Sequence, residues 1–195
     1  MDANVRAILA EMQHWGREHD ARHQDKSQKM LNLHPDTAHL MSILICASRR
    51  RHLLEIGTSN GYSTVWLAWS ARKTAGNVIT IDRSADKLKL ADENLRKAGL
   101  RDVVDLQNGD ATEIIRRLPG PFDLVFFDAD RVTAPTQFNL LLPKLTSDVL
   151  VLADNALSHR DEIAAYLALF EARPEFEHTI VPVGNGLSLA YRTGA

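Results

Sequence analysis

The sequence lacks the features that mark secreted and membrane-spanning proteins. It has a single cysteine, Cys46, inside the apolar run LMSILICA, so no disulfide can form within the chain and the residue is expected to be a buried small hydrophobe. No apolar run approaches the length that crosses a bilayer, and the N-terminal stretch has no positively charged start followed by an apolar core. We therefore expect a cytoplasmic protein without a membrane partner.

An excess of positive charge is also absent. Lys and Arg number 23 against 25 Asp and Glu, a formal net charge of -2, so there is no basic field to attract a nucleic acid and no such partner is expected. Repeats, low-complexity tracts and linkers rich in Pro, Gly or Ser are missing too. With 45% hydrophobic residues, the chain is expected to form one domain over residues 1–195, with residues 1–50 as an N-terminal helical segment.

The sequence does contain a regular alternation of short apolar runs with helical patterns. Near-continuous apolar strands separated by helices are typical of a parallel sheet covered on both faces, which predicts a doubly wound, mostly parallel α/β fold. The last two apolar runs are joined by GNG, which predicts a C-terminal antiparallel hairpin. The runs in question are HLLEIG, NVITID, VVDLQNGD, FDLVFFDAD, DVLVLADN, EHTIVPV and LSLAYR.

Acidic residues close several of the predicted strands. Ligands of doubly wound folds bind beyond the carboxyl ends of the strands, so each of these acids is a candidate site residue. The set comprises Glu55, Asp82, Asp110, Asp128, Asp130 and Asp154.

The stretch LLEIGTSNGYSTVWLA, which joins the first predicted strand to a helix, indicates the kind of ligand. Gly57 and Gly61 allow a tight turn and a close approach of backbone to ligand, and the helix N-terminus that follows suits an anionic group. Asp82, at the end of the second predicted strand, can accept both hydroxyls of a ribose. Glu55 would repel a pyrophosphate and attract an ammonium group. A carboxylate, an amine and a ribose together predict S-adenosylmethionine as the cofactor.

Five motifs together resemble the class I S-adenosylmethionine-dependent O-methyltransferases, more closely the catechol and caffeoyl-CoA O-methyltransferase type with its bacterial members. They are LEIGTSNGYSTVWLA, VITIDRSADKLKLADENLRKAGL, NGDA, FDLVFFDAD and VLADN. The resemblance extends from MLNLHPDTAHLMSIL to PVGNGLSLAYR, most of the chain. It implies a Rossmann-like methyltransferase that acts on a hydroxyl of a small, ortho-dihydroxy aromatic acceptor. It also implies a homodimer, for which the N-terminal helix with Trp15 is the expected contact.

The resemblance further implies which residues bind the cofactor. The glycine turn would hold the methionine part, Asp110 and Ala111 would lie beside the adenine, and Leu33 would pack on the cofactor from the N-terminal side. The full set is Leu33, Glu55, Gly57, Thr58, Ser59, Gly61, Tyr62, Ser63, Asp82, Arg83, Asp110, Ala111, Asp128 and Asp130.

A metal site is implied by the same resemblance, and the residues themselves agree with it. Asp128, Asp154 and Asn155 match the divalent-metal ligands of the family. The two acids each end an apolar run, so adjacent parallel strands would present both at one edge, beside the amide oxygen of Asn155. Oxygen ligands suit magnesium. Zinc is less suited, because it favours His and Cys ligands and these motifs contain neither. The metal would gather two vicinal hydroxyls and favour loss of a proton from one, and the oxyanion would attack the sulfonium methyl in line.

Arg131 departs from the family pattern, which usually has a lysine at this position. Arginine stays protonated, so it can hold an anion but cannot act as a general base. Asp128 and Arg131 are the catalytic candidates. After Asn155 the chain enters a helix almost directly, through ALSHRDEIAAY, where relatives have a longer loop, so we expect an open acceptor pocket. Such a pocket would take a larger acceptor, be completed by a second subunit, or mark lost activity.

Three alternatives follow from these departures and from the fold. One is a metal-independent methyltransferase, and another is a non-catalytic cofactor-binding protein, which Arg131 and the short loop would suit. The third is a nicotinamide-dependent oxidoreductase, which would share the fold and Asp82. The spacing G-x-x-x-G argues against it, because a dinucleotide is expected to need G-x-G-x-x-G.

Some polar residues near these motifs are predicted to be structural. Asp123, inside the run PFDLVFF, and His34, before a helix that begins at Pro35, are expected to serve the backbone around them. The cluster ASRRRH before the first strand is expected to be a solvated turn.

Overall fold

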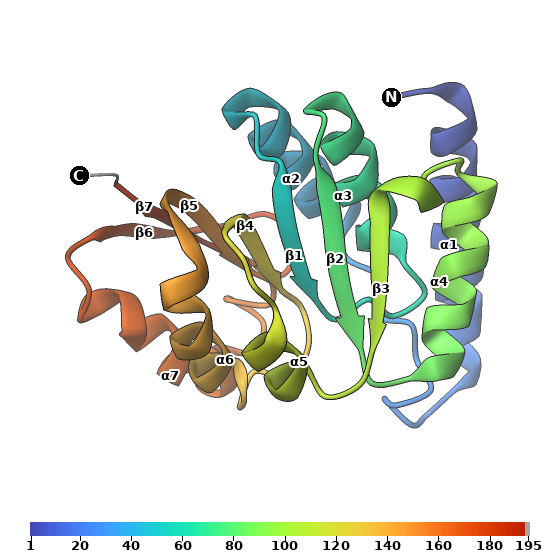
Figure 1. The fold of residues 1–195 in the computed structure, drawn as a ribbon. Helices are drawn as coiled ribbons and strands as arrows, with labels where there is room; N and C mark the ends of the chain where they lie inside the picture. Colours follow the sequence, from blue (N-terminus) through green and yellow to red (C-terminus); the bar gives the residue numbers. More distant parts are fainter. Residues whose placement is uncertain (194–195) are drawn as a thin grey trace.

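The structure is a computed structural model that describes residues 1–193, and in this part of the chain the fold is built around one seven-stranded sheet (Figure 1). The strands are β1 (His52–Ile56), β2 (Asn77–Asp82), β3 (Val104–Asn108), β4 (Phe122–Phe127), β5 (Leu145–Ala153), β6 (Phe176–Val181) and β7 (Leu187–Arg192). Their order is β3-β2-β1-β4-β5-β7-β6, and the first five are parallel. The predicted doubly wound sheet and its C-terminal hairpin are confirmed; β7 lies between β5 and β6 and is antiparallel to both.

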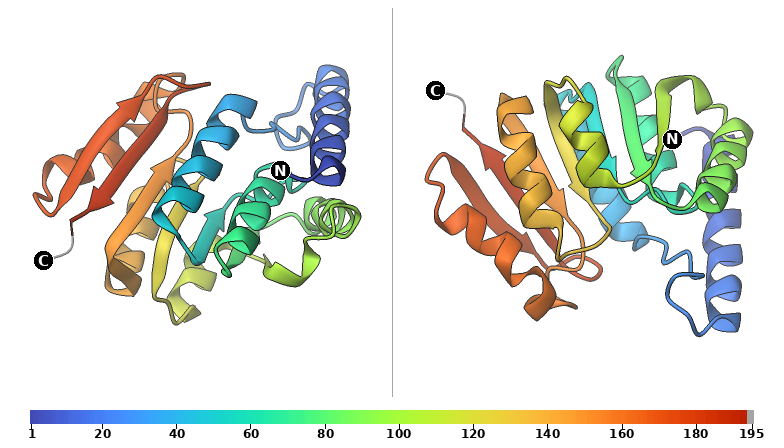
Figure 2. Two further views of the ribbon diagram at one scale, coloured as in Figure 1. Left: turned by 90° about the horizontal axis from the view of Figure 1, so that it is seen from above. Right: turned by 60° about the horizontal axis from the view of Figure 1, so that its bottom comes forward.

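Helices cover both faces of the sheet (Figures 1 and 2). One group contains α1 (Ala3–Arg22), α2 (Pro35–Ser48), α3 (Tyr62–Lys73) and α4 (Ala85–Lys97). The other contains α5 (Ala111–Arg117), α6 (Ala134–Leu141) and α7 (Arg160–Glu171). The 3-10 turns η1 (Arg101–Val103) and η2 (Leu142–Lys144) complete the elements. Among the helices of residues 1–193, none is both long and apolar enough to cross a membrane.

The alternation of side chains along the strands supplies both faces with apolar groups. In β1, Leu53 belongs to the core shared with α1–α3, and the next residue, Leu54, belongs to the core shared with α5–α7. In β4, Phe126 and Phe127 divide in the same way. Successive strand residues point to opposite faces, so a continuous apolar run fills two cores at once. Because β1–β5 are parallel, their carboxyl ends all lie at the same end of the sheet, which comes forward in the right-hand view of Figure 2.

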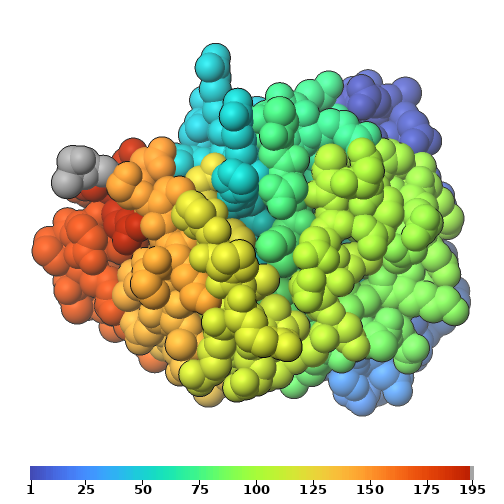
Figure 3. Space-filling view, in the orientation of Figure 1, coloured from blue at the N-terminus to red at the C-terminus, as the bar shows by residue number. Residues whose placement is uncertain are grey.

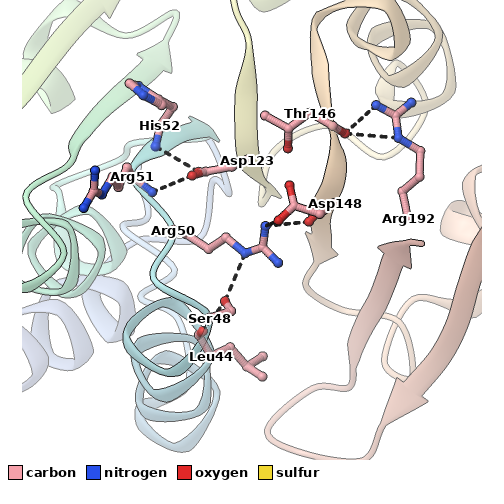
Figure 4. Close-up of polar contacts among 9 residues, drawn as sticks. All are labelled: Leu44, Ser48, Arg50, Arg51, His52, Asp123, Thr146, Asp148 and Arg192. Atoms are coloured by element: carbon pink, nitrogen blue, oxygen red, sulfur yellow. Dashed lines mark hydrogen bonds and ion pairs between the residues drawn. The ribbon is translucent and has the colours of Figure 1, made fainter. Parts of the chain in front are cut away.

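At the opposite end of the sheet, where β1 begins, the structure corrects one expectation from the sequence. Arg50, predicted to lie in a solvated turn, is only 5% exposed. Its Nη1 donates to the backbone oxygen of Asp148 and lies 3.1 Å from that residue's Oδ2, while its Nε donates to Ser48 Oγ (Figure 4). Asp123 is structural as predicted, because its carboxylate accepts from the backbone N–H groups of Arg51 and His52 at 2.7 and 2.8 Å (Figure 4). The cluster thus fastens α2 and β1 to β4 and β5.

In the N-terminal segment the structure confirms the expectation for His34 and corrects the one for Cys46. His34 caps α2 as predicted: its ring nitrogen accepts from the N–H of Asp36 at 3.3 Å. Cys46, predicted to be buried, is only partly buried and lines an apolar groove with Ile43, Trp66 and other residues of α1–α3.

Candidate functional site

The glycine turn between β1 and α3 is fixed by close backbone packing. Gly57 has φ +109°, and a Cβ at this position would lie 2.2 Å from the backbone oxygen of Asp128. Gly61 has φ +86° at the start of α3, where a Cβ would lie 3.0 Å from that of Ala91. Any other residue at Gly57 would separate the turn from the end of β4. The close approach predicted for a ligand is therefore made, at Gly57, by the protein itself.

Glu55 is fully enclosed beneath this turn. Its Oε1 accepts from Ser63 Oγ at 2.5 Å, and its Oε2 accepts from the hydroxyls of Thr64 and Thr80 at 2.5 and 2.6 Å. The hydroxyl of Thr58 lies 2.6 Å from that of Thr80 and extends the network. Burial raises the pKa of Glu55 to about 7, although the three hydroxyls oppose the shift. This placement connects β1, β2 and α3, and it differs from the direct contact with an amine that the sequence suggested.

Asp82 lies at the end of β2 and faces the same turn. Its Oδ2 accepts from the N–H of Ser59 at 2.8 Å and its Oδ1 from the N–H of Ser84 at 2.9 Å. Each carboxylate oxygen keeps a further lone pair, so the half-buried group can still accept two hydroxyls. The next residue, Arg83, is exposed. The geometry therefore suits the ribose contact predicted for Asp82.

A segment between α1 and α2, residues 23–34, reaches this turn from the N-terminal side and is called the strap here. Ser59 Oγ donates to the backbone oxygen of Met30 at 2.7 Å, and Lys87 Nζ donates to that of Lys29 at 2.6 Å. In Figure 3 the strap, in blue, emerges at the lower edge beside α4, in green. Leu33, predicted to pack on the cofactor, is 3% exposed and belongs to the core of α1–α3. The strap thus covers the turn without being part of it.

The loop after β3 contributes a helix cap. Asp110 is exposed and precedes α5, where its Oδ1 accepts from the N–H of Glu113 at 3.1 Å. Ala111 is the first residue of α5. Gly109 donates its N–H to the backbone oxygen of Asp82 at 3.0 Å, so this loop and the end of β2 lie side by side.

The acids after β4 and β5 lie at equivalent places on neighbouring strands. Phe127 of β4 pairs with Ala153 of β5, so Asp128 and Asp154 follow a paired position in each strand. Asp154 donates its backbone N–H to the oxygen of Phe127 at 3.1 Å. Sequence reasoning placed these two acids at one edge, and the structure brings them together there.

The surroundings of this pair favour a positive charge. Burial, followed by the charges of Asp154 and Glu55, raises the pKa of Asp128 well above its ordinary range, and Arg131 opposes the shift. Burial likewise raises the pKa of Asp154 to about 6, against the Asn155 backbone and the charges of Arg131 and His34. Both carboxylates would ionise more readily with a cation between them.

One narrow pocket unites the acidic pair with the residues around it. Its lining includes Asp128, Asp130, Arg131, Asp154 and Asn155. Asn155 has φ +67°, and its Oδ1 accepts from Ser158 Oγ at 3.1 Å. Within residues 1–193, no group of three His, Cys, Asp or Glu side chains forms a metal site by itself, so the candidate ligands are two acids and an amide.

Two of these residues face other partners as well. Asp130 is exposed, and its Oδ1 accepts from the N–H of Val132 at 3.0 Å, so it shapes its own turn. Arg131 Nε lies 3.6 Å from Glu162 Oε2 on α7, and its side chain is 22% exposed. The charge of Arg131 therefore lies between the acidic pair and α7.

The lining of the pocket also contains residues that the sequence motifs did not indicate. Ile163 and Tyr166 of α7 line it together with Gln137 of α6. The apolar spacing in RDEIAAYLALFEA predicts only that one face of this helix is buried. Their position under the acidic pair depends on how α7 packs, which no local pattern shows.

Known proteins are similar to this chain in sequence and in fold. The sequence model of a family described as O-methyltransferase matches residues 5–193. A catechol O-methyltransferase of Niastella koreensis is 30% identical over 131 residues, covering 65% of this chain and 59% of that protein. One of Mycobacterium tuberculosis is 34% identical over 118 residues, covering 60% and 53%. The chain thus spans less than two thirds of the length of these relatives.

A solved structure agrees over a longer range. The O-methyltransferase TomG from Streptomyces achromogenes, in complex with SAM, has a TM-score of 0.79 and is 25% identical. The similarity covers 100% of this chain and 91% of that one. Together with the motifs at the strand ends, the match over residues 5–193 shows that the chain belongs to the O-methyltransferase family.

Proposed function

We propose that the protein transfers a methyl group from S-adenosylmethionine to a hydroxyl of a small, ortho-dihydroxy aromatic acceptor, with the help of a divalent metal. One observation carries this proposal: the glycine turn with Asp82 and the acidic pair Asp128 and Asp154 share one edge of the sheet, in contact through Gly57 and Asp128. A cofactor held by the turn would have its reactive end beside the acidic pair. The catechol O-methyltransferase names of two relatives support the acceptor class.

The cofactor would be held mainly by backbone and by Asp82. Gly61 gives α3 no side-chain cap; the N–H of Tyr62 donates to Asn60 Oδ1, and the N–H groups of Ser63 and Thr64 would receive a carboxylate. Asp82 would accept the ribose hydroxyls, and the loop of Asp110 and Ala111 would border the adenine. Glu55 would act through Ser63 and Thr64, which it fixes at the start of α3.

The residues present fit a hard divalent metal. The carboxylates of Asp128 and Asp154 follow a paired position on neighbouring strands and line one pocket, and the pKa values of both are raised, as expected for acids that a cation would stabilise. Asn155 adds a neutral oxygen beside them. Magnesium bound by these three residues would hold both acceptor oxygens and favour the ionised form of one hydroxyl.

Arg131 would take part by holding charge rather than by moving a proton. Its guanidinium stays protonated, and it lines the same pocket as Asp128. It would attract an acceptor oxygen that carries negative charge and align it with the methyl group. The acceptor hydroxyl would lose its proton to water. The resulting oxyanion would gain the methyl while the carbon–sulfur bond breaks, and the sulfonium would become a neutral thioether.

A second candidate function is a methyltransferase that works without metal. The observation in its favour is the position of Arg131, whose charge opposes the rise in the pKa values of Asp128 and Asp154 and so partly takes the place of a metal ion. A non-catalytic cofactor-binding protein would keep the same cofactor contacts. Membership in the O-methyltransferase family removes the support for a nicotinamide-dependent oxidoreductase.

The deciding experiment is a turnover screen of catechols and related ortho-diols with S-adenosylmethionine, with magnesium and with a chelator. Metal-dependent methylation supports the proposal, and equal rates in chelator support the metal-independent enzyme. If no phenol of a broad panel is methylated while S-adenosylhomocysteine still raises the melting temperature, the non-catalytic protein is favoured. NAD in the same melting assay is the control and should have no effect.

We also infer that the partner of the chain is a second copy of itself. Trp15 on α1 is 40% exposed, which is large for a tryptophan on a helix that packs against a core. Light scattering on the purified protein measures the mass directly, and a monomer at micromolar concentration would contradict this inference.

A further inference from the structure

Three buried polar atoms around the acidic pair lack a hydrogen-bond partner among residues 1–193. They are Tyr166 Oη, Asp154 Oδ1 and Arg131 Nε. All three residues line the same pocket. A buried polar atom without a partner is costly and uncommon in folded proteins, so three around one pocket point to a common occupant.

Tyr166 is the most informative of the three because its position is fixed. The side chain is fully buried, and its ring centroid lies 5.4 Å from that of Phe127, 6.2 Å from Phe138 and 5.3 Å from Phe170. Phe127 of β4, Phe138 of α6 and Phe170 of α7 thus hold the ring from three elements. The hydroxyl cannot rotate to solvent, so any partner must be inside the pocket.

The same conclusion holds for the other two atoms. Arg131 Nε lies 3.6 Å from Glu162 Oε2, which is too long for a hydrogen bond. Asp154 is 5% exposed, and no group among residues 1–193 donates to its Oδ1. Neither residue can satisfy its buried atom through another side chain in the present arrangement.

The size and chemistry of the pocket select the occupant. The space open to the centre of a water molecule is about 10 Å³, which is about the minimum volume that one water needs. The occupant must accept a hydrogen bond from Arg131 Nε, donate one to Asp154 Oδ1 and form a third with the hydroxyl of Tyr166. Water has both donors and acceptors, and buried waters commonly make about three hydrogen bonds.

We propose that one buried water joins Tyr166 to Asp154 and Arg131, and that Tyr166 is thereby a positioning residue for Asp154. The water would fix the carboxylate and leave its other oxygen turned to the strand edge. Groups that orient a metal ligand commonly change metal affinity by about 10- to 100-fold when they are removed. The inference rests on the proposed function only where it concerns the metal.

The test compares Tyr166→Phe, which removes one oxygen and keeps the ring, with the control Tyr191→Phe on β7, outside the pocket. If water bridges the hydroxyl, Tyr166→Phe should lower the melting temperature by about 2–4 °C relative to the control. A hydroxyl without any partner predicts the opposite sign, because its removal would relieve the cost of burial. A raised melting temperature would overturn the proposal.

A second readout concerns positioning. Binding of Mn²⁺, followed by electron paramagnetic resonance, should be weakened at least severalfold in Tyr166→Phe and unchanged in Tyr191→Phe, while the affinity for S-adenosylhomocysteine stays the same in both. Unchanged Mn²⁺ affinity in Tyr166→Phe overturns the positioning role. If wild type itself binds no Mn²⁺, the metal part of the proposed function fails together with this role, and the melting temperatures then decide the water alone.

Discussion

The acids at the strand ends are alike in sequence and differ in their surroundings. Glu55 is enclosed by three hydroxyls, Asp82 is half-buried and held by two backbone N–H groups, and Asp110 is an exposed helix cap. The sequence places each of them correctly at the end of a strand. It cannot show which is enclosed, because Thr80, which closes over Glu55, lies 25 residues away on another strand.

The enclosure of Glu55 predicts a particular dependence of stability on pH. Its pKa rises from 4.5 to about 7 on folding. Below about pH 4.5 both folded and unfolded states bind the proton; between pH 4.5 and 7 the unfolded state loses it first, so the free energy of unfolding falls as pH rises. The full loss is of order 3 kcal/mol at most, and it is constant above pH 7.

The variant Glu55→Gln, which cannot ionise, should lack this fall. Urea unfolding of wild type and variant at a series of pH values between 4.5 and 8 measures the difference. The stability of the variant relative to wild type should increase over this range. Parallel curves for the two proteins would show that Glu55 does not hold its proton in the folded state.

The position of Asp82 predicts that its removal weakens cofactor binding. Asp82→Ala removes the acceptor for two hydroxyls and should weaken binding of S-adenosylhomocysteine by about 1–3 kcal/mol. Asp86→Ala, four positions later and exposed on α4, is the matched control. Calorimetry checks both, and an unchanged affinity in Asp82→Ala would place the ribose elsewhere.

At the scale of elements, the sequence predicts most strands and helices but not what connects them. Apolar runs and helical spacing are local, so the parallel strands and the final hairpin could be predicted. The position of β7 between β5 and β6 depends on pairing between distant segments. The burial of Arg50 likewise depends on Asp148, 98 residues away, which local polarity in ASRRRH does not reveal.

The strap is a further element whose role appears only in the structure. Asp20 on α1 accepts from the N–H of Met30 at 2.7 Å with one oxygen and from that of Leu31 at 2.9 Å with the other. Ser59 bonds the Met30 carbonyl through its hydroxyl and Asp82 through its N–H. One chain of hydrogen bonds therefore runs from α1 through the strap to the predicted ribose acid.

We predict that Asp20→Asn loosens the strap and shortens the lifetime of the bound cofactor. The substitution replaces charge-assisted bonds by weaker ones, so amide exchange in residues 29–33 should become faster and S-adenosylhomocysteine should dissociate severalfold faster. Asp25→Asn is the control, because within residues 1–193 the Asp25 carboxylate accepts a hydrogen bond from the N–H of Ser27, in its own turn. Equal dissociation rates in the two variants would show that the strap does not retain the cofactor.

At the scale of the whole molecule, the site is divided between two halves of the sheet. Most of the predicted cofactor residues lie in or beside β1, β2 and α3, with Asp110 and Ala111 after β3. The acidic pair follows β4 and β5, and Asp128 is predicted to serve both the cofactor and the metal. The halves meet where Gly57 packs on Asp128. The residues of both halves could be proposed from the motifs at the strand ends, because each motif is a short local stretch of sequence. The pocket with Tyr166 could not be predicted, since it forms only when α7 packs beneath Asp154.

This division predicts that metal and cofactor can be lost separately. Asp154→Ala removes one carboxylate from a hard-ion site, so metal binding and metal-stimulated turnover should fall by at least tenfold. Affinity for S-adenosylhomocysteine should change little, because the cofactor is held by the other half. Asp161→Ala, an exposed acid in the first turn of α7, is the control.

The metal-free stability of the same variant separates a lost ligand from a damaged fold. Burial raises the pKa of Asp154 to about 6, so at pH 8 the folded protein carries an unfavourable buried charge that alanine would remove. Asp154→Ala should therefore melt no earlier than wild type in chelator, even though its turnover is lost. If Asp154→Ala stays as active as wild type, or wild type turns over fully in chelator, the acidic pair serves structure and the charge at this edge is supplied by Arg131.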